Sequence, residues 1–596
     1  MTEVTTEDLA RVVEGRTLAT TFLDTVAAHG DRVALRERQA DDSWAEWTYD
    51  EYAKHVAGAA AHLRSLGVGP GDRVVLMMRN SAAFHMVDLA VMFCGATAIS
   101  IYNSSSPEQV EYLAGHCKAK VAIVEDDGFA ERFSKVRDHL PALTHVVNLA
   151  EDGVARAMFD SGKVDLREAA SLVTPDTLAT VIYTSGTTGP PKGVMISQFN
   201  VMWTIESYRR CMGDDIDLTG VRVVSYLPMA HIAERMTSHY IGLYWAAEVT
   251  ACPDPGQIAR YLKEAQPELV FGVPRVWEKL HAGLAAALAG DPEKQAKFEQ
   301  GVELAKPIAL ARAWGTSTPE QDATWDALQQ LAFEPMRAAV GLDQVRFAIT
   351  GAAPIARELL EWFNAIGVPL SEIYGMSESS GPITWAPLRI KPGTVGPAIP
   401  GCEVTLADDG EIICRGGNVF EGYLDDPVKT AEALDDEAWL HTGDIGQVDD
   451  DGYCRIVDRK KELIITAGGK NISPANLESA MKTEPLIGQA CAIGDGRPFV
   501  AALVVLDPEV APAWAKSHGI DATSLADLAT NSEVVAEVER GVNEVMQEFN
   551  NAERVKKVKV LSEEWLPDSD ELTPTSKLKR RGVHAKYAAE IESLYA

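Results

Sequence analysis

Short apolar runs alternate with longer amphipathic stretches along much of the chain. The run "DRVVLMM" at 72–78 is apolar from its first valine onward, whereas "YDEYAKHVAGAAAHLRSLG" at 49–67 places apolar residues three and four positions apart. The first pattern predicts a buried strand and the second an amphipathic helix. Because alternation of the two is typical of βαβ units around a mostly parallel sheet, we predict an α/β fold. Further strand-like runs are "KAKVAIVED" (118–126), "VRVVSYLPM" (221–229), "PELVFGVP" (267–274) and "VRFAITGAAP" (345–354).

Two segments depart from this alternation. Between about 277 and 341 the chain is rich in Ala, Gln and Glu at helical spacing, which predicts a helical insertion. From about 394 to 458, short strand-like runs such as "GEIICRGG" alternate with turns, which predicts a β-rich subdomain. The charged stretch "DRKKE" at 458–462 then precedes a compact α/β pattern, so we predict one domain of 1–458 and a second of 459–596. A tight charged turn inside one domain explains that stretch equally well.

Composition and charge narrow the class of protein. The chain has 596 residues, enough for several domains, and its formal net charge of −32 argues against general nucleic-acid binding. Its first residues lack a cationic region followed by an apolar one, and no apolar run approaches the roughly 18–20 residues that span a bilayer. We therefore expect a cytoplasmic protein. None of the eight cysteines forms a C-x-x-C pair, so we expect reduced core residues rather than a zinc site or disulfides.

The stretch "YTSGTTGPPKGV" at 183–194 combines glycines, hydroxyl residues and one lysine behind the strand-like run "LATVIY". Glycines let backbone amides approach an anion, hydroxyl groups donate to its oxygens, and Lys192 supplies a positive charge. The pattern predicts a phosphate-binding loop. It differs from the usual P-loop, G-x-x-x-x-G-K-[ST], because Gly193 stands where a hydroxyl residue would hold Mg²⁺. The alternative is an ordinary surface turn, which explains most short glycine-rich stretches.

Three further motifs carry candidate ligand-binding residues. Gly351 to Pro354 follow a predicted strand and precede a helix, so their backbone could line a ligand at the carboxyl end of the strand. In "EIYGMSESSG", the ring of Tyr374 could stack on a base and the carboxylate of Glu378 could hold Mg²⁺. In "WLHTGDIG", Asp444 could accept hydrogen bonds from both hydroxyls of a ribose. Taken singly, core packing for Tyr374, a solvated turn for Glu378 and a turn aspartate for Asp444 are the commoner explanations.

His231 in "LPMAHIAERM" is the candidate histidine. It stands beside a proline turn and before the apolar and aromatic run "HYIGLYWAAEV". A lone histidine is more often structural, and its spacing to Glu234 and His239 is not H-E-x-x-H, so the sequence predicts no zinc site here. Near the end, "ELTPTSKLKRR" places four cations in an acidic chain, for which a solvated basic face is the default explanation.

Taken together, these motifs resemble one family. "YTSGTTGPPKGV", "YGMSES", "HTGD", "DRKKELIITAGGKNISP" and "PTSKLKRR" occur in the order found in the acyl-adenylate-forming (AMP-binding) superfamily. The resemblance spans nearly the whole chain, and "SYLPMAHIAER", "FGVPRVWEKL" and the helical insertion further resemble long-chain fatty acid–CoA ligases. It implies a large N-terminal domain of two βαβ lobes plus a β-barrel-like subdomain, followed by a small mobile α+β C-terminal domain.

The resemblance also implies roles for individual residues. The pyrophosphate loop would be formed by Thr184, Ser185, Gly186, Thr187, Thr188, Gly189 and Lys192. Further contacts to ATP or AMP would come from Gly351, Ala352, Tyr374 and Gly375 near adenine, Ser377 at the α-phosphate, and Asp444 and Arg459 at the ribose. Mg²⁺ would bind to Glu378 and Thr187. The catalytic set would be Lys192, His231, Glu378 and the adenylation lysine Lys577.

Two mobile features follow from the same resemblance. Lys461 would be the hinge between the domains, and Gly468 and Gly469 would line the CoA channel. The sequence departs from the family pattern at Ser576, where many members have glycine. It departs again at Glu234 and its neighbour Arg235, where some bacterial long-chain enzymes carry a gating tryptophan.

The reaction that the resemblance implies has two steps. ATP and a long-chain fatty acid would give acyl-AMP and pyrophosphate, and the acyl group would then pass to CoA with release of AMP. The nearest alternative is a ligase that hands the acyl group to a carrier protein, which consumption of free CoA distinguishes. A serine hydrolase would need G-x-S-x-G, which "GMSES" lacks, and a non-catalytic nucleotide-binding module would release no pyrophosphate. The sequence leaves open the acyl chain length, the tunnel gating, the oligomeric state and any peripheral contact with the inner face of the membrane.

Overall fold

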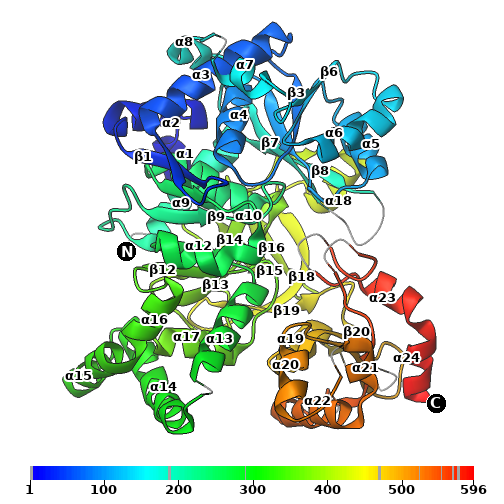
Figure 1. The fold of residues 1–596 in the computed structure, drawn as a ribbon. Coiled ribbons are helices and arrows are strands. Elements are labelled where there is room, and N and C mark those ends of the chain that lie inside the picture. Colours follow the sequence, from blue (N-terminus) through cyan, green and yellow to red (C-terminus); the bar gives the residue numbers. More distant parts are fainter. Residues whose placement is uncertain are drawn as a thin grey trace.

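The computed structural model of the protein describes residues 4–160, 162–184, 190–288, 290–466, 471–522, 524–551, 553–566, 569–573 and 577–596. Within them the chain folds as the predicted α/β protein, with a large N-terminal domain and a smaller C-terminal domain (Figure 1). No helix in this described part is long and apolar enough to cross a membrane.

One lobe of the N-terminal domain is a sheet covered by helices on both faces. Its elements are β3 (Arg73–Met77), β4 (Thr97–Ser100), β5 (Val121–Val124), β6 (His145–Asn148), β7 (Leu178–Thr184), β8 (Lys192–Ser197), β17 (Gly422–Tyr423), α3 (Tyr49–Ser65), α4 (Ala82–Met92), α5 (Pro107–His116), α6 (Asp127–Val136), α7 (Val154–Asp160) and α8 (Leu166–Ala170). The strand order is β17-β8-β7-β4-β3-β5-β6, and the pairs from β7 to β6 are parallel. In β3, Val74 and Leu76 pack with α3 and α4, while Val75 and Met77 pack with α5 and α6. Burial on both faces explains the continuous apolar run of this strand.

The second lobe contains another largely parallel sheet. Its elements are β1 (Val33–Arg38), β2 (Trp44–Thr48), β9 (Arg222–Ser225), β10 (Glu248–Ala251), β11 (Leu269–Gly272), β12 (Phe347–Thr350), β13 (Leu370–Met376), β14 (Gly381–Trp385), α2 (Leu18–His29), α9 (Gln198–Met212), α10 (Ile232–Glu234), the π-helical turn η2 (Arg235–Tyr240), α11 (Ile241–Tyr244), α12 (Ile258–Ala265) and α17 (Arg357–Ala365). The strand order is β14-β13-β12-β11-β9-β10-β1-β2, with β12 and β13 as parallel neighbours. The motif that begins at Gly351, after β12, and the motif with Tyr374 and Glu378, at the end of β13, therefore lie together at the carboxyl ends of these strands.

The predicted helical insertion is present. It comprises α13 (Pro274–Leu288), α14 (Pro292–Ala313), α15 (Pro319–Leu328), the π-helical turn η4 (Gln329–Phe333) and α16 (Glu334–Val340). It begins at Pro274, slightly before the predicted start, because proline is well suited to the first turn of a helix. Trp277 of α13 is fully buried and packs edge-to-face on Phe363 of α17, with ring centroids 5.2 Å apart, which fixes the insertion on the second lobe.

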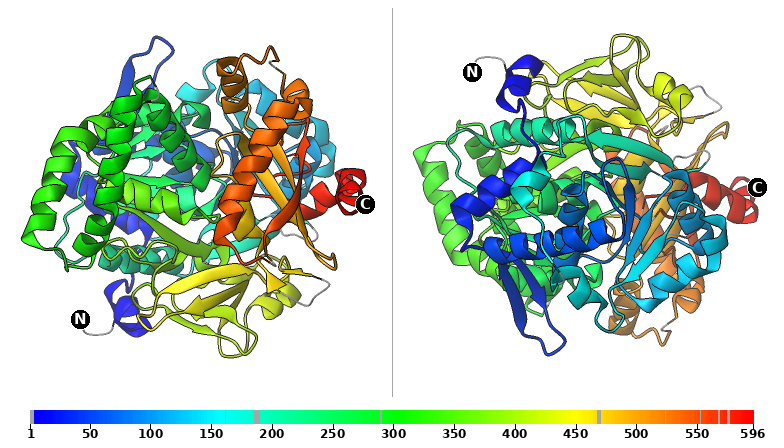
Figure 2. Two further views of the ribbon diagram at one scale, coloured as in Figure 1. Left: turned by 90° about the horizontal axis from the view of Figure 1, so that it is seen from below. Right: turned by 90° about the horizontal axis from the view of Figure 1, so that it is seen from above.

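Short antiparallel strands form the β-rich subdomain that the sequence predicts. They are β15 (Glu403–Leu406), β16 (Glu411–Arg415), β18 (Leu440–Val448) and β19 (Cys454–Arg459), in the order β15-β16-β18-β19, and α18 (Pro427–Ala433) lies between two of them in the chain. Figure 2 shows α1 (Thr6–Val12) beside these strands. The Trp203 indole of α9 donates to the carbonyl of Thr6 at 3.3 Å and ties this first helix to the domain.

The C-terminal domain has hydrophobic clusters of its own. Its elements are β20 (Ile464–Ile465), β21 (Asn471–Ile472), β22 (Ile487–Ile493), β23 (Val500–Leu506), β24 (Val555–Leu561), α19 (Pro474–Met481), α20 (Val510–Ser517), α21 (Leu525–Thr530), α22 (Ser532–Val545), α23 (Arg580–Lys586) and α24 (Ala588–Tyr595). The central strand β23 is buried along its length, and its alternate side chains enter two clusters, one with α22 and one with α23 and α24. The precise boundary after residue 458 stays a prediction.

Ion pairs link the C-terminal domain to the insertion. Arg275 of α13 pairs with Asp507, and Lys279 Nζ lies 3.0 Å from Glu509 Oε1. Figure 1 shows the C-terminal domain, in orange and red, next to the insertion and the β18–β19 strands. Long charged side chains rather than a shared apolar core therefore make this contact.

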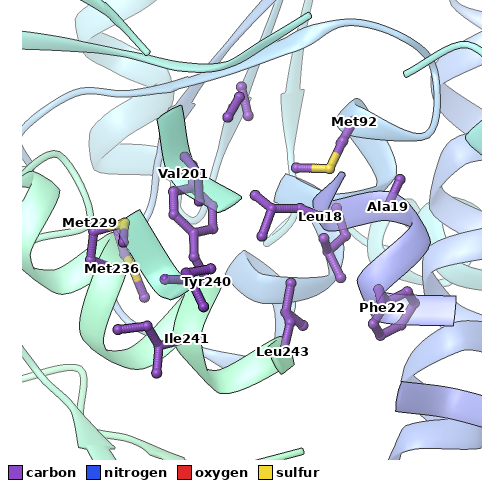
Figure 3. Close-up of a cluster of buried hydrophobic side chains, with 14 of the residues drawn as sticks. Leu18, Ala19, Phe22, Met92, Val201, Met229, Met236, Tyr240, Ile241 and Leu243 are labelled. Atoms are coloured by element: carbon purple, nitrogen blue, oxygen red, sulfur yellow. The ribbon is translucent and has the colours of Figure 1, made fainter. Parts of the chain in front are cut away.

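Buried apolar side chains gather where α2, α4 and α9 meet the α10–α11 segment (Figure 3). They include Leu18, Ala19, Phe22, Met92, Val201, Met229, Met236, Tyr240, Ile241 and Leu243. The eight cysteines, all of them described, are free, and the predicted core position holds for all except the half-buried Cys211.

Candidate active site

Lys192 begins β8, and the register of the hairpin pairs it with Thr184 at the end of β7. The intervening Ser185, Gly186, Thr187, Thr188 and Gly189 lie outside the described residues. The Lys192 ammonium is 3.9 Å from the centroid of the Tyr423 ring, which is a cation–π contact. Desolvation lowers the pKa of Lys192, and the nearby charge of Glu378 opposes that shift. A cation at the end of the loop thus faces a carboxylate from a different motif.

Glu378 follows β13 in the short 3₁₀ turn η5 (Ser377–Ser379). The hydroxyl of Tyr423, on β17, donates to its Oε1 at 2.8 Å. Proteins usually hold Mg²⁺ through one or two carboxylates together with substrate phosphates, and a single carboxylate beside a phosphate-binding lysine fits that donor set. The described residues contain no group of three or more His, Cys, Asp or Glu side chains that could hold a metal without substrate.

Asp444 is 4% exposed, and the antiparallel pair β18–β19 places it directly opposite Arg459. Arg459 Nε lies 3.0 Å from Oδ1, and the Tyr374 hydroxyl donates to Oδ2 at 2.7 Å. Burial raises the pKa of Asp444, and the Arg459 guanidinium opposes that rise. The explanation of Asp444 as a turn residue is wrong, because it is buried within a strand and two other side chains hold its carboxylate.

The backbone at the end of β12 and β13 is tightly packed. A Cβ at Gly375 would lie 1.8 Å from the carbonyl oxygen of Gly381, and one at Gly351 would lie 2.8 Å from a β13 side chain. Ala352 has a left-handed φ of 69°, a strained conformation for a residue with a Cβ and one that clusters at functional sites. Ser377 is buried beside these residues in the chain. Their contacts with adenine and the α-phosphate stay predictions.

His231 is the N-cap of α10, and its Nδ1 accepts the backbone N–H of Ala233 at 3.1 Å. In a neutral imidazole the proton then lies on Nε2. Desolvation, followed by repulsion from Lys577, lowers the pKa of His231 to about 3. The ring is therefore a neutral hydrogen-bond donor through Nε2 near pH 7.

Lys577 comes from the C-terminal domain, where its carbonyl accepts the Thr573 N–H at 2.8 Å and its own N–H donates to Thr573 Oγ1 at 2.9 Å. Desolvation and then repulsion from Arg459 lower the pKa of Lys577 to about 8, while the charges of Asp444 and Glu378 oppose the shift. Lys577 as a whole is an exposed residue, so the desolvation acts at its ammonium end. The structure thus brings a lysine from the end of the chain to the carboxylates of the N-terminal domain.

The residues on either side of Lys461 bind to different domains. Lys460 pairs with Glu411 of β16 at 3.1 Å, whereas Glu462 pairs with Arg580 of the C-terminal domain at 3.3 Å. Lys461 lies exposed between them. A connector anchored on both sides concentrates rotation at one residue, which supports its predicted hinge role. The side chain of Arg580 is only 15% exposed, so the solvated basic face is the wrong explanation for this member of the terminal cluster.

Two family models match this arrangement of domains. Residues 22–424 match the AMP-binding enzyme model, and residues 461–596 match the AMP-binding enzyme C-terminal domain model. The chain belongs to the AMP-binding enzyme family.

Curated relatives of this AMP-binding enzyme align over almost its whole length. The long-chain-fatty-acid–CoA ligase FadD15 of Mycobacterium bovis is 35% identical over 580 residues, 94% of each chain. The long-chain-fatty-acid–CoA ligase ACSBG2 of Xenopus laevis is 35% identical over 618 residues, covering 96% of this chain and 83% of the relative.

Solved structures share the fold of this AMP-binding enzyme. The adenylation domain of a carboxylate reductase from Mycobacterium chelonae superposes with a TM-score of 0.75 at 19% identity, over 99% of this chain and 93% of that one. A Mycobacterium tuberculosis fatty acyl CoA synthetase superposes with a TM-score of 0.61 at 21% identity, over 96% and 99% of the two chains.

Sequence reasoning missed Tyr423. This tyrosine contacts both Lys192 and Glu378, but it stands 45 residues after Glu378, in the unremarkable stretch "EGYLDD". Only the pairing of β17 with β8 brings it to the site, and no local signal indicates that pairing. Gly468 and Gly469, predicted for the CoA channel, lie outside the described residues.

Proposed function

We propose that this AMP-binding enzyme is a long-chain fatty acid–CoA ligase. It activates a fatty acid to acyl-AMP with release of pyrophosphate and then transfers the acyl group to CoA. The observation that carries the proposal is the convergence of Lys577, from the C-terminal domain, with Asp444 and Glu378 of the N-terminal domain. The names of relatives that align over nearly the whole chain support the substrate class.

Activation solves a chemical problem of the substrate. A carboxylate is a poor electrophile, because its leaving group would be oxide. In the first step its oxygen attacks the α-phosphorus of ATP, the bond to the bridging oxygen breaks, and pyrophosphate leaves. Lys192 stabilises the departing pyrophosphate, and Lys577 bridges the carboxylate and the α-phosphate. The neutral His231 donates through Nε2 to the substrate carboxylate and orients it.

Other residues hold the nucleotide. Asp444 accepts from the ribose hydroxyls, and Arg459 and Tyr374 keep its carboxylate in place. Glu378 and Thr187, with the substrate phosphates, would hold Mg²⁺, which supplies charge neutralisation on the transferring phosphates.

The second step needs the same site in another arrangement. The thiol of CoA attacks the acyl carbon, the carbon–oxygen bond to AMP breaks, and AMP leaves. Rotation at Lys461 withdraws Lys577 and brings Gly468 and Gly469 to the CoA channel. We place the enzyme in the cytoplasm, where ATP and CoA are supplied.

We place the acyl chain in the apolar cluster of Figure 3. Met229 and Met236 flank His231 in the chain and belong to this cluster. Met236 also reaches β14, since its Cγ is 3.7 Å from the position of a Cβ at Gly381. Methionine is flexible enough to repack around a bound chain. The cluster therefore offers an apolar continuation from the carboxylate position.

Pyrophosphate release measured across fatty acids from acetate to very long chains tests the substrate class. Each buried CH₂ contributes roughly 0.8 kcal/mol, so kcat/KM should rise severalfold per methylene until the cluster is filled. Met236→Trp should move the optimum to shorter acids, whereas Leu331→Trp, on an exposed site, should not. Equal kcat/KM for acetate and palmitate would sink the proposal.

Lys577→Ala tests the two-step reaction. The variant should lose acyl-AMP formation and yet convert synthetic acyl-AMP and CoA to acyl-CoA near the normal rate, because its charge acts in the first transition state. The neighbouring exposed Arg581→Ala serves as a control. Acyl-AMP formation without any consumption of free CoA by the unmodified enzyme would favour the ligase that acts on a carrier protein.

A further inference from the structure

The loop between β9 and α10, residues 226–231, carries His231, and a fully buried arginine lies behind it. Arg235 is the first residue of η2 and has 0% exposure. Its Nε donates to the carbonyl of Met229 at 3.0 Å, two residues before the histidine. Nη1 donates to the Tyr240 hydroxyl at 2.8 Å, and Nη2 donates to Ser100 Oγ at 2.9 Å. The fork of the guanidinium thus joins the loop to β4 and to the π-helical turn.

Asp88 of α4 balances the charge of this arginine. Its Oδ2 lies 2.8 Å from Arg235 Nη2, and its Oδ1 accepts from His239 Nε2 at 3.1 Å. The other side of the His239 ring meets His85, with the two Nδ1 atoms 2.9 Å apart. A fully buried ion pair of this kind contributes little to stability compared with an apolar replacement. We therefore look for the role of this ion pair in the loop backbone that Arg235 binds.

Glu234 supplies a second tie to the same loop. Its Oε2 accepts the backbone N–H of Leu227 at 3.1 Å, and its Oε1 accepts from Ser238 Oγ at 2.6 Å. The Asn80 amide donates to the carbonyl of Leu227 at 2.9 Å. Buried side chains therefore bind three backbone groups of the loop, which are the N–H and C=O of Leu227 and the C=O of Met229.

These contacts leave the imidazole little freedom. The loop before His231 is held by Glu234, Asn80 and Arg235, and the ring itself caps α10 through Ala233. Given the proposed function, on which this inference rests, we propose that Arg235 and Glu234 are positioning residues that hold His231 toward the substrate carboxylate. Arg235 and Glu234 thereby fix the backbone of the loop that carries His231.

Arg235→Lys is the main test. It keeps a cation opposite Asp88 but lacks the fork that reaches Met229 and Ser100. Misplacement of a reacting group by 1 Å can cost about 10²-fold, so pyrophosphate release with palmitate should slow about tenfold to hundredfold, with KM for ATP unchanged. Ser100→Ala, which leaves the ion pair intact, should show a smaller loss of the same kind.

A matched control lies at the edge of the first lobe. Arg137 also donates to backbone carbonyls, those of Leu140 at 3.1 Å and Thr144 at 3.3 Å, far along the chain from the site. Arg137→Lys should leave pyrophosphate release unchanged.

A double-mutant cycle separates positioning from a merely structural role. In a His231→Ala background, Arg235→Lys or Ser100→Ala should add little further loss, because each acts through the histidine. A full additional loss in that background, or activity losses that only follow the fraction of folded protein, would overturn the inference. If the unmodified enzyme released no pyrophosphate with any fatty acid, the proposed function itself would fail instead.

Discussion

The buried carboxylate of Asp444, held by Arg459 and Tyr374, is the proposed acceptor for the ribose of the nucleotide. Asp444→Ala removes a charged acceptor for the ribose, and hydrogen bonds to charged groups contribute roughly 1.5–3 kcal/mol each. Since 1.4 kcal/mol corresponds to a factor of ten, KM for ATP should rise about tenfold or more, with the fold retained. Steady-state kinetics with ATP as the varied substrate, together with thermal melting, provides the measurement.

A matched control for this prediction is Asp451→Ala, which removes an exposed aspartate that pairs with Lys391. It should change neither KM nor the melting temperature appreciably. An unchanged KM in Asp444→Ala, with a lowered melting temperature, would assign Asp444 a structural role only.

The lowered pKa of Lys577 predicts a pH dependence. With a pKa of about 8, the lysine is a cation below that pH and loses its charge above it. Because kcat/KM reports the free enzyme, kcat/KM for pyrophosphate release should fall as pH rises through about 8. Lys577→Arg should lack this alkaline limb, since arginine stays protonated. If the unmodified enzyme and Lys577→Arg showed the same fall in kcat/KM above pH 8, the titrating group would be a residue other than Lys577.

At the scale of elements, glycine packing at the end of β13 controls whether the site can form. A Cβ at Gly375 would meet the carbonyl of Gly381, so Gly375→Ala should separate β13 from β14 and destabilise the protein by about 1–3 kcal/mol. Gly283, in helix α13, has open space around its Cβ position, so Gly283→Ala should stabilise by about 0.5–1 kcal/mol. Denaturant unfolding compares the two variants. If both substitutions changed the free energy of unfolding equally and in the same direction, the space around each glycine would not explain the change.

The strands that the hydrophobic pattern of the sequence predicts correctly are those that are buried along almost their whole length. The runs around β3, β11 and β12 are apolar because these strands are covered on both faces, and their sequences predict them. Asp444 shows the limit of this reasoning. Its glycine neighbour indicates a turn, yet Gly443 has a positive φ inside the continuous strand β18. Pairing with β19, which no local pattern encodes, decides that outcome.

The candidate site residues also differ in whether a local sequence pattern reveals them. Lys192 and Glu378 stand in motifs that local chemistry makes recognisable, whereas Tyr423 and the Arg235 network depend on contacts between distant segments. Arg235 meets Asp88 across 147 positions of the chain. A sequence can suggest which residues have useful chemistry, but burial and tertiary neighbours determine which of them act together.

At the scale of the whole molecule, the ion pairs on α13 favour one arrangement of the two domains. Arg275→Ala combined with Lys279→Ala removes the pair of Arg275 with the buried carboxylate of Asp507 and the exposed pair of Lys279 with Glu509, of which the second is worth at most about 1 kcal/mol. The adenylating arrangement should lose population, so acyl-AMP formation should slow a few-fold, while thioester formation from synthetic acyl-AMP should hold steady or quicken. Single-turnover measurements of each half-reaction test this.

Lys297→Ala, which removes an exposed pair with Glu293 within α14, is the control for this double variant. It should alter neither half-reaction. An equal slowing of both half-reactions in the double variant would argue against an effect on domain arrangement.

The separate hydrophobic clusters of the C-terminal domain have a calorimetric consequence. Two cores that are linked by the connector, by ion pairs and by hydrogen bonds to Asp458, rather than by a shared apolar core, need not melt together, so heating should give two transitions rather than one. A non-hydrolysable acyl-AMP analogue that contacts Lys577 and Asp444 at once would bind only when both domains are folded. By mass action it should raise the lower transition until the two merge. The ligand would thus turn two independently melting bodies into a single cooperative unit.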